Sequence, residues 1–188
     1  MLNVYDIAFN SRIYGPELRT VIWFQGCSIQ CKGCINPHLW SFDCKELISV
    51  NSLVDKIPNN DVTLLGGEPL DQEDILDFVK ELKRKEIGII LFTGYSIREL
   101  QGSRLECTKL CDVVISEPFE IHQLNPKLYL RGSDNQVITF NSDRYNPGDF
   151  EQSESIEVII GNQVEIHGRN NDKLLWELLK KNDAKQSK

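Results

Sequence analysis

Short apolar runs alternate with segments of helical spacing along the first 115 residues of the chain. Five runs rich in β-branched and aromatic residues predict strands, at residues 2–8, 20–25, 62–65, 87–92 and 112–115. Apolar residues three and four positions apart predict three helices, at residues 47–57, from a cap at Asp71 onward, and around 97–110 with an interruption near Gly102. Strands that alternate with helices at this interval form parallel βαβ units, so the pattern predicts an α/β fold.

The last third of the chain has a different pattern. Residues 156–160 and 163–167 flank Gly161-Asn162, which predicts a β-hairpin with a two-residue turn. A helix capped by Asn170 or Asn171 is expected next, with a leucine stripe on one face and a frayed tail after it. Because the stretch between the sheet and this hairpin is polar and irregular, we expect a main domain at 1–140 and a small hairpin–helix extension at 141–188.

Three loops with unusual composition follow predicted strands. They are Cys27 to Cys34, Gly66-Gly67-Glu68-Pro69, and Thr93-Gly94-Tyr95. In parallel sheets, ligands bind at the carboxyl ends of the strands. The sequence therefore predicts that the three loops meet at one site.

The first of these loops holds three cysteines at the spacing C-x3-C-x2-C, namely Cys27, Cys31 and Cys34. Clustered thiolates bind zinc or an iron–sulfur cluster. Three protein ligands leave one metal position open for chemistry, whereas a structural zinc site takes four. His38 or Cys44 could supply the fourth ligand, so the spacing alone leaves both a zinc module and an open cluster as interpretations.

Composition narrows the class of protein. The chain has 188 residues, a formal charge of −7 and a pI near 5, which argues against nucleic acid as a partner. No apolar run reaches the length of a membrane span, and the first residues do not form a signal peptide. We therefore expect a cytoplasmic protein without a membrane partner, in which thiols stay reduced. Cys107 and Cys111 are expected to be small buried residues, with a second cluster that includes Cys44 as the alternative.

A resemblance emerges from six pieces of sequence between residues 14 and 136. They are Tyr14-Gly15-Pro16 with Leu18-Arg19-Thr20, the cysteine loop, Asn36 with Trp40, Gly66 to Leu70, Thr93 to Tyr95, and Arg131 to Gln136. With these pieces the chain resembles radical SAM enzymes, and more closely the activating proteins of anaerobic ribonucleoside-triphosphate reductase. The resemblance implies a partial (β/α) barrel of parallel strands.

The resemblance also implies the chemistry. Cys27, Cys31 and Cys34 would hold three irons of a 4Fe–4S cluster, and S-adenosylmethionine would bind the fourth. An electron passed through the cluster would release a 5′-deoxyadenosyl radical, which would take a hydrogen from a glycine of a glycyl radical enzyme such as anaerobic ribonucleotide reductase. Flavodoxin or ferredoxin would supply the electron. No catalytic acid or base is implied.

Further residues are assigned by the same resemblance. Gly66, Gly67 and Glu68 would cradle the methionine end of the cofactor, although a plain tight turn is the alternative. The backbone at Gly33 and Ile35 would meet the adenine. Thr93 and Tyr95 would line the same pocket, with a position in the core as the alternative for the tyrosine.

The chain departs from the family pattern at a few positions. Glu17 stands where glycine usually follows Gly15-Pro16, and Ile35 stands where an aromatic residue is common. Ser116-Glu117 replaces an Asp-Gly that usually precedes Pro-Phe. Two rival functions stay open: radical chemistry on a peptide or small molecule, and a non-catalytic zinc module that binds a partner.

Overall fold

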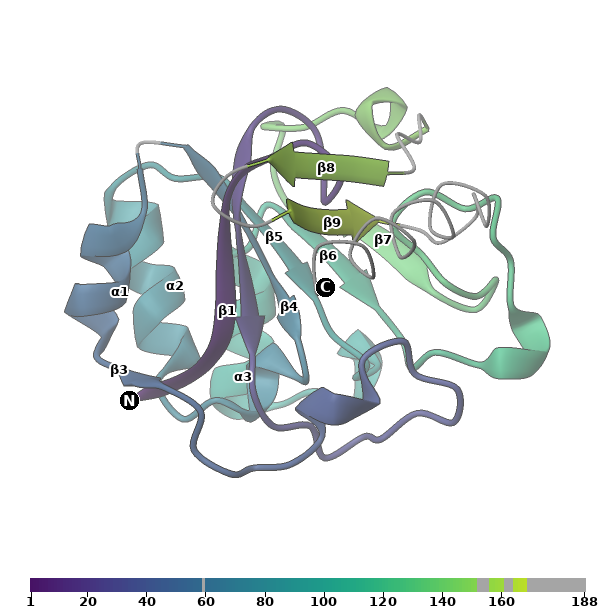
Figure 1. The fold of residues 1–188 in the computed structure, drawn as a ribbon, viewed down its shortest axis with the longest axis horizontal. Coiled ribbons are helices and arrows are strands. Elements are labelled where there is room, and N and C mark those ends of the chain that lie inside the picture. Colours follow the sequence, from purple (N-terminus) through teal and green to yellow (C-terminus); the bar gives the residue numbers. More distant parts are fainter. Residues whose placement is uncertain (59, 152–155, 161–163, 169–188) are drawn as a thin grey trace, which may run out of the picture.

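The computed structural model describes residues 1–188 except 59, 152–155, 161–163 and 169–188. The described residues form a seven-stranded sheet in the order β3-β1-β2-β4-β5-β6-β7 (Figure 1). The strands are β1 Leu2–Ser11, β2 Arg19–Phe24, β3 Leu47–Ile48, β4 Asp61–Gly66, β5 Ile89–Phe92, β6 Val113–Ser116 and β7 Val137–Phe140. The α-helices are α1 Val50–Lys56, α2 Ile75–Arg84 and α3 Gly102–Leu110. Short 3-10 helices are η1 Pro37–Leu39, η2 Pro69–Asp71, η3 Ile97–Glu99, η4 Ile121–Gln123 and η5 Pro147–Phe150.

The centre of the sheet is parallel, as predicted, and its edges are not. Strands β2, β4, β5 and β6 run parallel, with Trp23 opposite Leu65 and Leu64 opposite Leu91. Strand β1 pairs antiparallel with both β2 and β3, and β7 pairs antiparallel with β6. The seven residues between β1 and β2 are too few for the crossover that a parallel pair requires, so this pair must be antiparallel. The sheet is therefore mixed.

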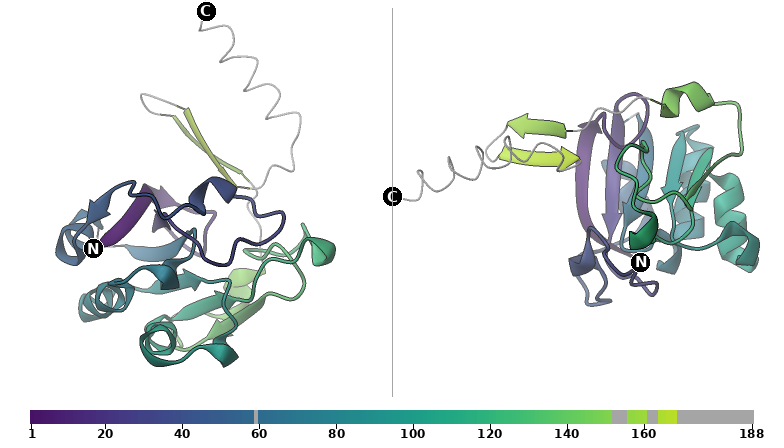
Figure 2. Two further views of the ribbon diagram at one scale, coloured as in Figure 1. Left: turned by 90° about the horizontal axis from the view of Figure 1, so that it is seen from below. Right: turned by 90° about the vertical axis from the view of Figure 1, so that its right-hand side faces the viewer.

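The three α-helices of the described residues pack together against one face of the sheet (Figures 1 and 2). Fully buried residues of the parallel strands, such as Phe24, Leu64 and Leu91, pack against Phe78 of α2 in one large core. Burying such a side chain contributes roughly 1.5–3 kcal/mol. Alternate residues of the same strands point to the opposite face, where a smaller cluster forms around Trp23. This second face carries none of the described α-helices, which leaves room for a site.

Two predicted helix starts are wrong. The first helix was expected from Leu47, but Leu47 and Ile48 form β3, and α1 begins after Ser49, whose side chain accepts from the Ser52 N–H. The second helix begins at Ile75, and its N-cap is Asp74 instead of Asp71. Asp71 ends η2 and bonds to other parts of the chain. The interruption of the third helix is confirmed, since η3 and α3 are separate.

One strand of the main sheet and the C-terminal hairpin also differ in how well the sequence predicted them. Strand β7 was not predicted, although its four residues are β-branched or aromatic; in the structure Val137 is exposed and the other three are partly buried. The two strands expected for the hairpin are present as β8 Ile156–Ile160 and β9 Val164–Gly168, paired antiparallel. The predicted turn at Gly161-Asn162 and the predicted helix after Asn170 lie outside the described residues. Among the described helices, none has both the length and the apolar character needed to span a bilayer.

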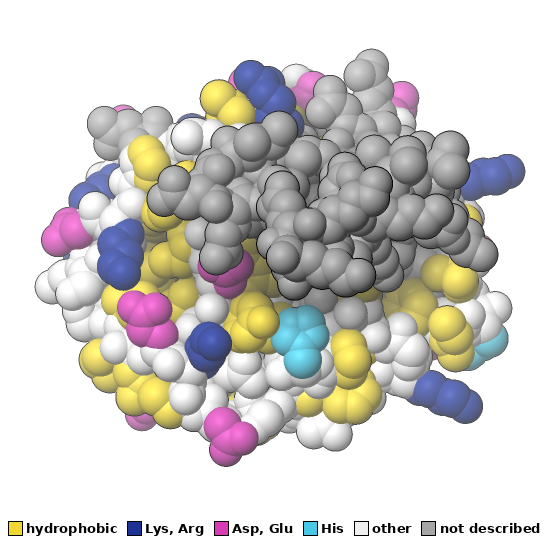
Figure 3. Space-filling model, viewed as in Figure 1, with side chains coloured by type: hydrophobic (Ala, Val, Ile, Leu, Met, Phe, Trp, Pro, Cys, Tyr) yellow, Lys and Arg dark blue, Asp and Glu magenta, His cyan; other side chains and the backbone are white. Residues whose placement is uncertain are grey.

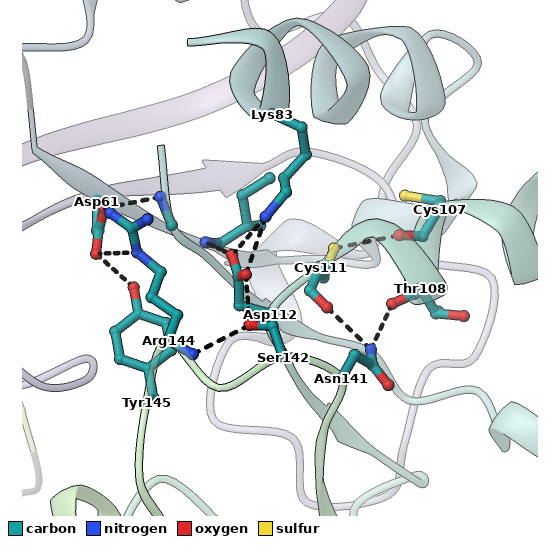
Figure 4. Close-up of polar contacts among 12 residues, drawn as sticks. Asp61, Lys83, Cys107, Thr108, Cys111, Asp112, Asn141, Ser142, Arg144 and Tyr145 are labelled. Carbon is teal, nitrogen blue, oxygen red and sulfur yellow. Dashed lines mark hydrogen bonds and ion pairs between the residues drawn. The ribbon is translucent and has the colours of Figure 1, made fainter. Parts of the chain in front are cut away.

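Residues 141–150 follow the predicted domain boundary but bond extensively to the main sheet. Buried Asp112 accepts from Ser142 Oγ at 2.7 Å, from Lys83 Nζ at 2.9 Å and from the Ile89 N–H at 2.8 Å (Figure 4). Asn141 donates to the carbonyls of Thr108 and Cys111, both at 2.9 Å. These bonds attach the segment to the ends of α2, α3 and β5. The division at residue 140 stays a prediction.

Asp61 at the start of β4 makes the second attachment of this segment. It accepts from Tyr145 Oη at 2.6 Å, from Arg144 Nη2 at 2.7 Å and from the Gly88 N–H at 2.7 Å (Figure 4). Tyr145 also accepts from Arg19 Nη1 at 3.0 Å, and Arg19 is completely buried. We call these four residues, Asp61, Arg19, Arg144 and Tyr145, the Asp61 network. It closes the edge of the sheet where the parallel strands begin.

The remaining cysteines outside the loop differ in environment. Cys107 and Cys111 are buried, as expected, and the Cys111 thiol donates to the Cys107 carbonyl at 3.3 Å. Burial raises the pKa of Cys111 well above its ordinary value. Cys44 is exposed. The buried pair therefore fills space in the core beside α3.

Candidate functional site

A cavity of about 660 Å³ opens at the carboxyl ends of the parallel strands, on the face without described α-helices. Residues from the loops after β2, β4, β5 and β6 line it. Its volume lies within the range of roughly 300–1,000 Å³ typical of small-molecule sites. Its walls combine apolar strand residues, including Trp23, Leu65 and Phe92, with the thiols of the cysteine loop. The expected meeting of the three loops at this edge is confirmed.

Cys27, Cys31 and Cys34 all line this cavity, and all three are free thiols. The start of the loop is attached to the segment that follows it, because the Cys27 N–H donates to the Trp40 carbonyl at 3.1 Å, and the end of the loop forms a turn in which the Cys34 N–H donates to the Cys31 carbonyl at 3.1 Å. Cys44 does not line the cavity. His38 does line it, and its ring lies 5.3 Å from the ring of Tyr5. Three thiols from one loop therefore share a single cavity.

The donor set fits an iron–sulfur cluster. Clusters are held by cysteine thiolates; burial raises the pKa of Cys27 and of Cys31, and the positive charge of a bound metal would favour their thiolate form. Within the described residues, no three cysteine, histidine or acidic side chains converge closely enough to hold a single metal ion. The three thiolates would be the ligands, and the cavity beside them provides space for a group larger than one ion.

Gly66 and Gly67 form a turn that packs directly against the start of the cysteine loop. Gly66 has a φ of 121°, and a Cβ atom there would collide with the backbone of Phe24. A Cβ on Gly67 would collide with the Gly26 carbonyl. The Gly67 and Glu68 N–H groups donate to Phe24 and Gly26, both at 2.8 Å. These contacts require both glycines for packing; since both also line the cavity, their contact with a cofactor stays a prediction.

Glu68 is almost completely buried, with 1% of its surface exposed. Its carboxylate accepts from Thr93 Oγ1 at 2.8 Å, from the Gly94 N–H at 2.8 Å and from the Leu70 N–H at 2.9 Å. Burial raises the pKa of Glu68 to about 7, against the lowering effect of these donors. Glu68 thus joins the loops after β4 and β5 and lines the cavity, and the three donors to its carboxylate are neutral.

The other predicted cofactor contacts divide into two groups. Thr93 and Ile35 line the cavity, and Ile35 is 82% exposed. Gly33 and Tyr95 are not among the lining residues. Gly33 lies beside Ile121, and the Tyr95 hydroxyl bonds to Asp71 and Ser28. The roles assigned to all four stay predictions.

Several residues around the site were missed by the sequence analysis. Ser28, Asp71 and Arg104 form a bonded group with Tyr95, and no local pattern links positions so far apart. Trp40 lines the cavity, and its indole nitrogen is buried with no hydrogen-bond partner in the described structure. The motif containing Asn36 and Trp40 was the only signal for it.

The two glutamates that replace family glycines both lie in the left-handed backbone region. Glu17 has a φ of 63° and Glu117 a φ of 81°. A residue with a Cβ atom is strained there, by roughly 1–2 kcal/mol. Glu117 lines the cavity, whereas Glu17 lies beside the Asp61 network in a second cavity of about 310 Å³.

Comparison with known proteins agrees with this site. A family model described as "4Fe-4S single cluster domain" matches residues 13–139, which defines the class of protein. An anaerobic ribonucleoside-triphosphate reductase-activating protein from Haemophilus influenzae is 36% identical over 139 residues, covering 67% of this chain and 90% of that protein. Proteins of the same name from Enterobacteria phage T4 and Escherichia coli K12 are 33% and 28% identical, over 70% and 67% of this chain and 89% and 90% of theirs. The chain belongs to the family of anaerobic ribonucleoside-triphosphate reductase-activating proteins.

Proposed function

We propose that this chain is a radical SAM enzyme that installs a glycyl radical on an anaerobic ribonucleoside-triphosphate reductase. The observation that carries the proposal is the shared position of Cys27, Cys31 and Cys34 on one cavity large enough for a cofactor. The names of the relatives supply the partner. The site residues come from the family motifs that the cavity brings together.

In this proposal the three thiolates hold three irons of a 4Fe–4S cluster. A bound cluster would supply the electron for reductive cleavage of S-adenosylmethionine, and the chemistry would convert S-adenosylmethionine and a glycine of the partner to methionine, 5′-deoxyadenosine and a glycyl radical. Flavodoxin or ferredoxin is the proposed electron donor.

In this proposal the chain's own residues bind and orient the cofactor, and they exclude water from it. Glu68 and the turn at Gly66-Gly67 keep the loops after β2, β4 and β5 in contact. The buried Glu68 carboxylate, whose three hydrogen-bond donors are neutral, suits a cationic ligand group beside it. Apolar walls that include Trp23 and Phe92 limit the access of water to a reactive intermediate.

The first experiment tests the cluster and its ligands. Anaerobically reconstituted protein should be brown with about four irons per chain, and dithionite with S-adenosylmethionine should yield 5′-deoxyadenosine. Cys31→Ala should abolish both properties. Cys44→Ala is the matched control, because Cys44 is exposed and does not line the cavity, and it should keep both. A colourless protein with one zinc, lost equally in both variants, would favour the zinc module.

The second experiment tests the target of the radical. The reconstituted protein is mixed with the anaerobic reductase of the same organism, S-adenosylmethionine and reductant, and the electron paramagnetic resonance spectrum is recorded. A glycine-centred doublet is expected. If 5′-deoxyadenosine forms but no doublet appears, the radical acts on another target, such as a peptide or a small molecule.

The remaining parts of the proposal concern place and partners. We propose a cytoplasmic enzyme that binds neither nucleic acid nor a membrane. The formal charge of −7 supports this proposal. On the part of one face that the described residues form in Figure 3, acidic and basic side chains are scattered among apolar ones and do not form a basic stripe.

A further inference from the structure

Four residues from four separate segments meet at the outer side of the cysteine loop. Ser28 follows the first cysteine directly, Asp71 ends η2, Tyr95 follows β5, and Arg104 lies on α3. We call this group the Ser28 clamp. Its members are separated by up to 76 positions in the chain, from Ser28 to Arg104.

Asp71 is the centre of the clamp. One carboxylate oxygen, Oδ2, accepts from the Ser28 N–H at 2.8 Å. The other, Oδ1, accepts from Tyr95 Oη at 2.7 Å and from Arg104 Nη2 at 2.9 Å. Only 4% of the Asp71 side chain is exposed. Both oxygens are therefore engaged, and the charge is balanced by one arginine.

Tyr95 binds the side chain of Ser28. Ser28 Oγ lies 2.8 Å from Tyr95 Oη. Tyrosine has one O–H, which is given to Asp71, so the serine hydroxyl must donate to the tyrosine oxygen. The Arg104 guanidinium lies 4.6 Å from the centre of the Tyr95 ring, and its Nε donates to the Leu70 carbonyl at 3.0 Å. The backbone of Ser28 is therefore bound to the buried Asp71 carboxylate, and its side chain to the half-buried Tyr95.

Ser28 itself is exposed, and it adjoins a cysteine whose thiol lines the cavity. An exposed loop residue fixed by two hydrogen bonds has little freedom, and neither does the backbone next to it. We propose that Asp71, Tyr95 and Arg104 are positioning residues, which hold the backbone at Ser28 so that the Cys27 thiol is preset for metal binding. Such preorganisation lowers the cost of assembling a site from a flexible loop.

The test compares two tyrosine hydroxyls in the same chain. Tyr95→Phe removes the hydroxyl between Asp71 and Ser28 but keeps the ring under Arg104. Tyr145→Phe is the matched control, because its hydroxyl also donates to an aspartate and its ring also lies under an arginine, at the opposite edge of the sheet. Amide hydrogen exchange over residues 27–34 is measured on the metal-free full chain.

Tyr95→Phe removes two hydrogen bonds, one to Asp71 and one from Ser28. Loss of the bond that reaches Ser28 should speed exchange over residues 27–34 by about three- to tenfold. Reconstituted Tyr95→Phe should lose iron to a chelator faster by a similar factor. Tyr145→Phe should leave both rates unchanged while lowering the midpoint of thermal unfolding. Ser28→Ala should act like Tyr95→Phe, and Ser28→Thr, which keeps the hydroxyl, should restore the native rates.

The proposal is overturned if Tyr95→Phe leaves loop exchange unchanged, or if Tyr145→Phe accelerates it equally. The iron readout rests on the proposed function. Hydrogen exchange on the metal-free chain does not, because it requires neither a cluster nor S-adenosylmethionine. A chain without radical activity could therefore still show the clamp, and an active enzyme could still lack it.

Discussion

Two carboxylates, the half-buried Asp61 and the buried Glu68, lie at opposite ends of β4, and their pKa values are shifted in opposite directions. Asp61 is the first residue of β4, and Glu68 stands two residues beyond its end. Asp61 faces Arg144 and two further donors; burial raises its pKa, but the hydrogen bonds from Arg144 and Tyr145 outweigh burial and hold the pKa of Asp61 below its ordinary value. Glu68 has three neutral donors, and burial raises its pKa to about 7.

The two edges of the sheet differ in whether the protein itself supplies a cationic partner to the carboxylate. At the Asp61 edge the protein supplies the countercharge itself, and residues 141–150 close the structure there. At the Glu68 edge the three donors that bond to the carboxylate are neutral, and a cavity of about 660 Å³, whose lining includes the three thiols, Glu117 and Arg131, adjoins it. A buried carboxylate without a cation is costly, and under the proposed function a cationic cofactor offsets that cost.

The largest expected effect on stability comes from disrupting the Asp61 network. Asp61→Ala removes the acceptor of Tyr145, Arg144 and the Gly88 N–H, and it leaves buried donors without a partner. The free energy of unfolding should fall by about 2–3 kcal/mol; this value is discounted because Arg144 is 41% exposed. Chemical denaturation of the metal-free chain measures it.

Asp55→Ala serves as the control for this change. Asp55 is 79% exposed and lies 3.8 Å from Lys85, so its removal should cost less than about 0.5 kcal/mol. Equal losses in the two variants would contradict the importance given to the Asp61 network.

The two carboxylates should also respond to pH with opposite signs. Asp61 has a lowered pKa in the folded state, so its contribution is complete above its ordinary pKa and is lost as pH falls through the folded value. Glu68 has a raised pKa, so the folded state binds more protons than the unfolded state between about 4.5 and about 7. Its presence therefore lowers stability as pH rises through that window.

Glu68→Gln tests the second sign. The variant should lose the decline in unfolding free energy between about pH 4.5 and about pH 7, because glutamine does not ionise. Urea denaturation at half-unit pH steps, with the metal-free chain and Asp61→Asn in parallel, provides the comparison. An unchanged slope in Glu68→Gln would mean that the Glu68 carboxylate is ionised throughout this range.

Much of the parallel centre could be predicted from sequence. The buried strands β2, β4, β5 and β6 are nearly continuous apolar runs, and the rule that ligands bind at their carboxyl ends placed the three loops correctly. The edges could not be predicted in the same way. Strand β7 is only partly buried and shows no alternation, and β1 is antiparallel because of a short connection.

The hydrogen-bond networks around Asp71 and Asp61 could not be predicted from sequence patterns either. Asp71 begins a run of acidic residues before a helix, and this is the usual signal of a cap. Its real partners, Ser28 and Arg104, lie 43 and 33 positions away. Arg144 lies 83 positions from Asp61. Such pairs depend on the sheet order, which local periodicity does not specify.

The smallest expected effect compares the two strained glutamates, one at each edge. Glu17 lies beside the Asp61 network and Glu117 lines the cavity, each with a φ that favours glycine. Substituting glycine at either position removes strain of roughly 1–2 kcal/mol but adds the unfolded-state entropy of glycine, about 0.5–1 kcal/mol. Each variant should therefore gain about 0.5 kcal/mol in unfolding free energy.

A second measurement on the Glu17→Gly and Glu117→Gly variants distinguishes the two edges further. It is the affinity of each reconstituted variant for S-adenosylmethionine. Glu17→Gly should leave that affinity unchanged, because Glu17 lies away from the proposed cofactor cavity. Glu117→Gly removes a carboxylate from the cavity wall, so affinity should fall while stability rises. If both variants gain stability and neither loses affinity, the strain at Glu117 serves the backbone turn alone, and the carboxylate there takes no part in binding.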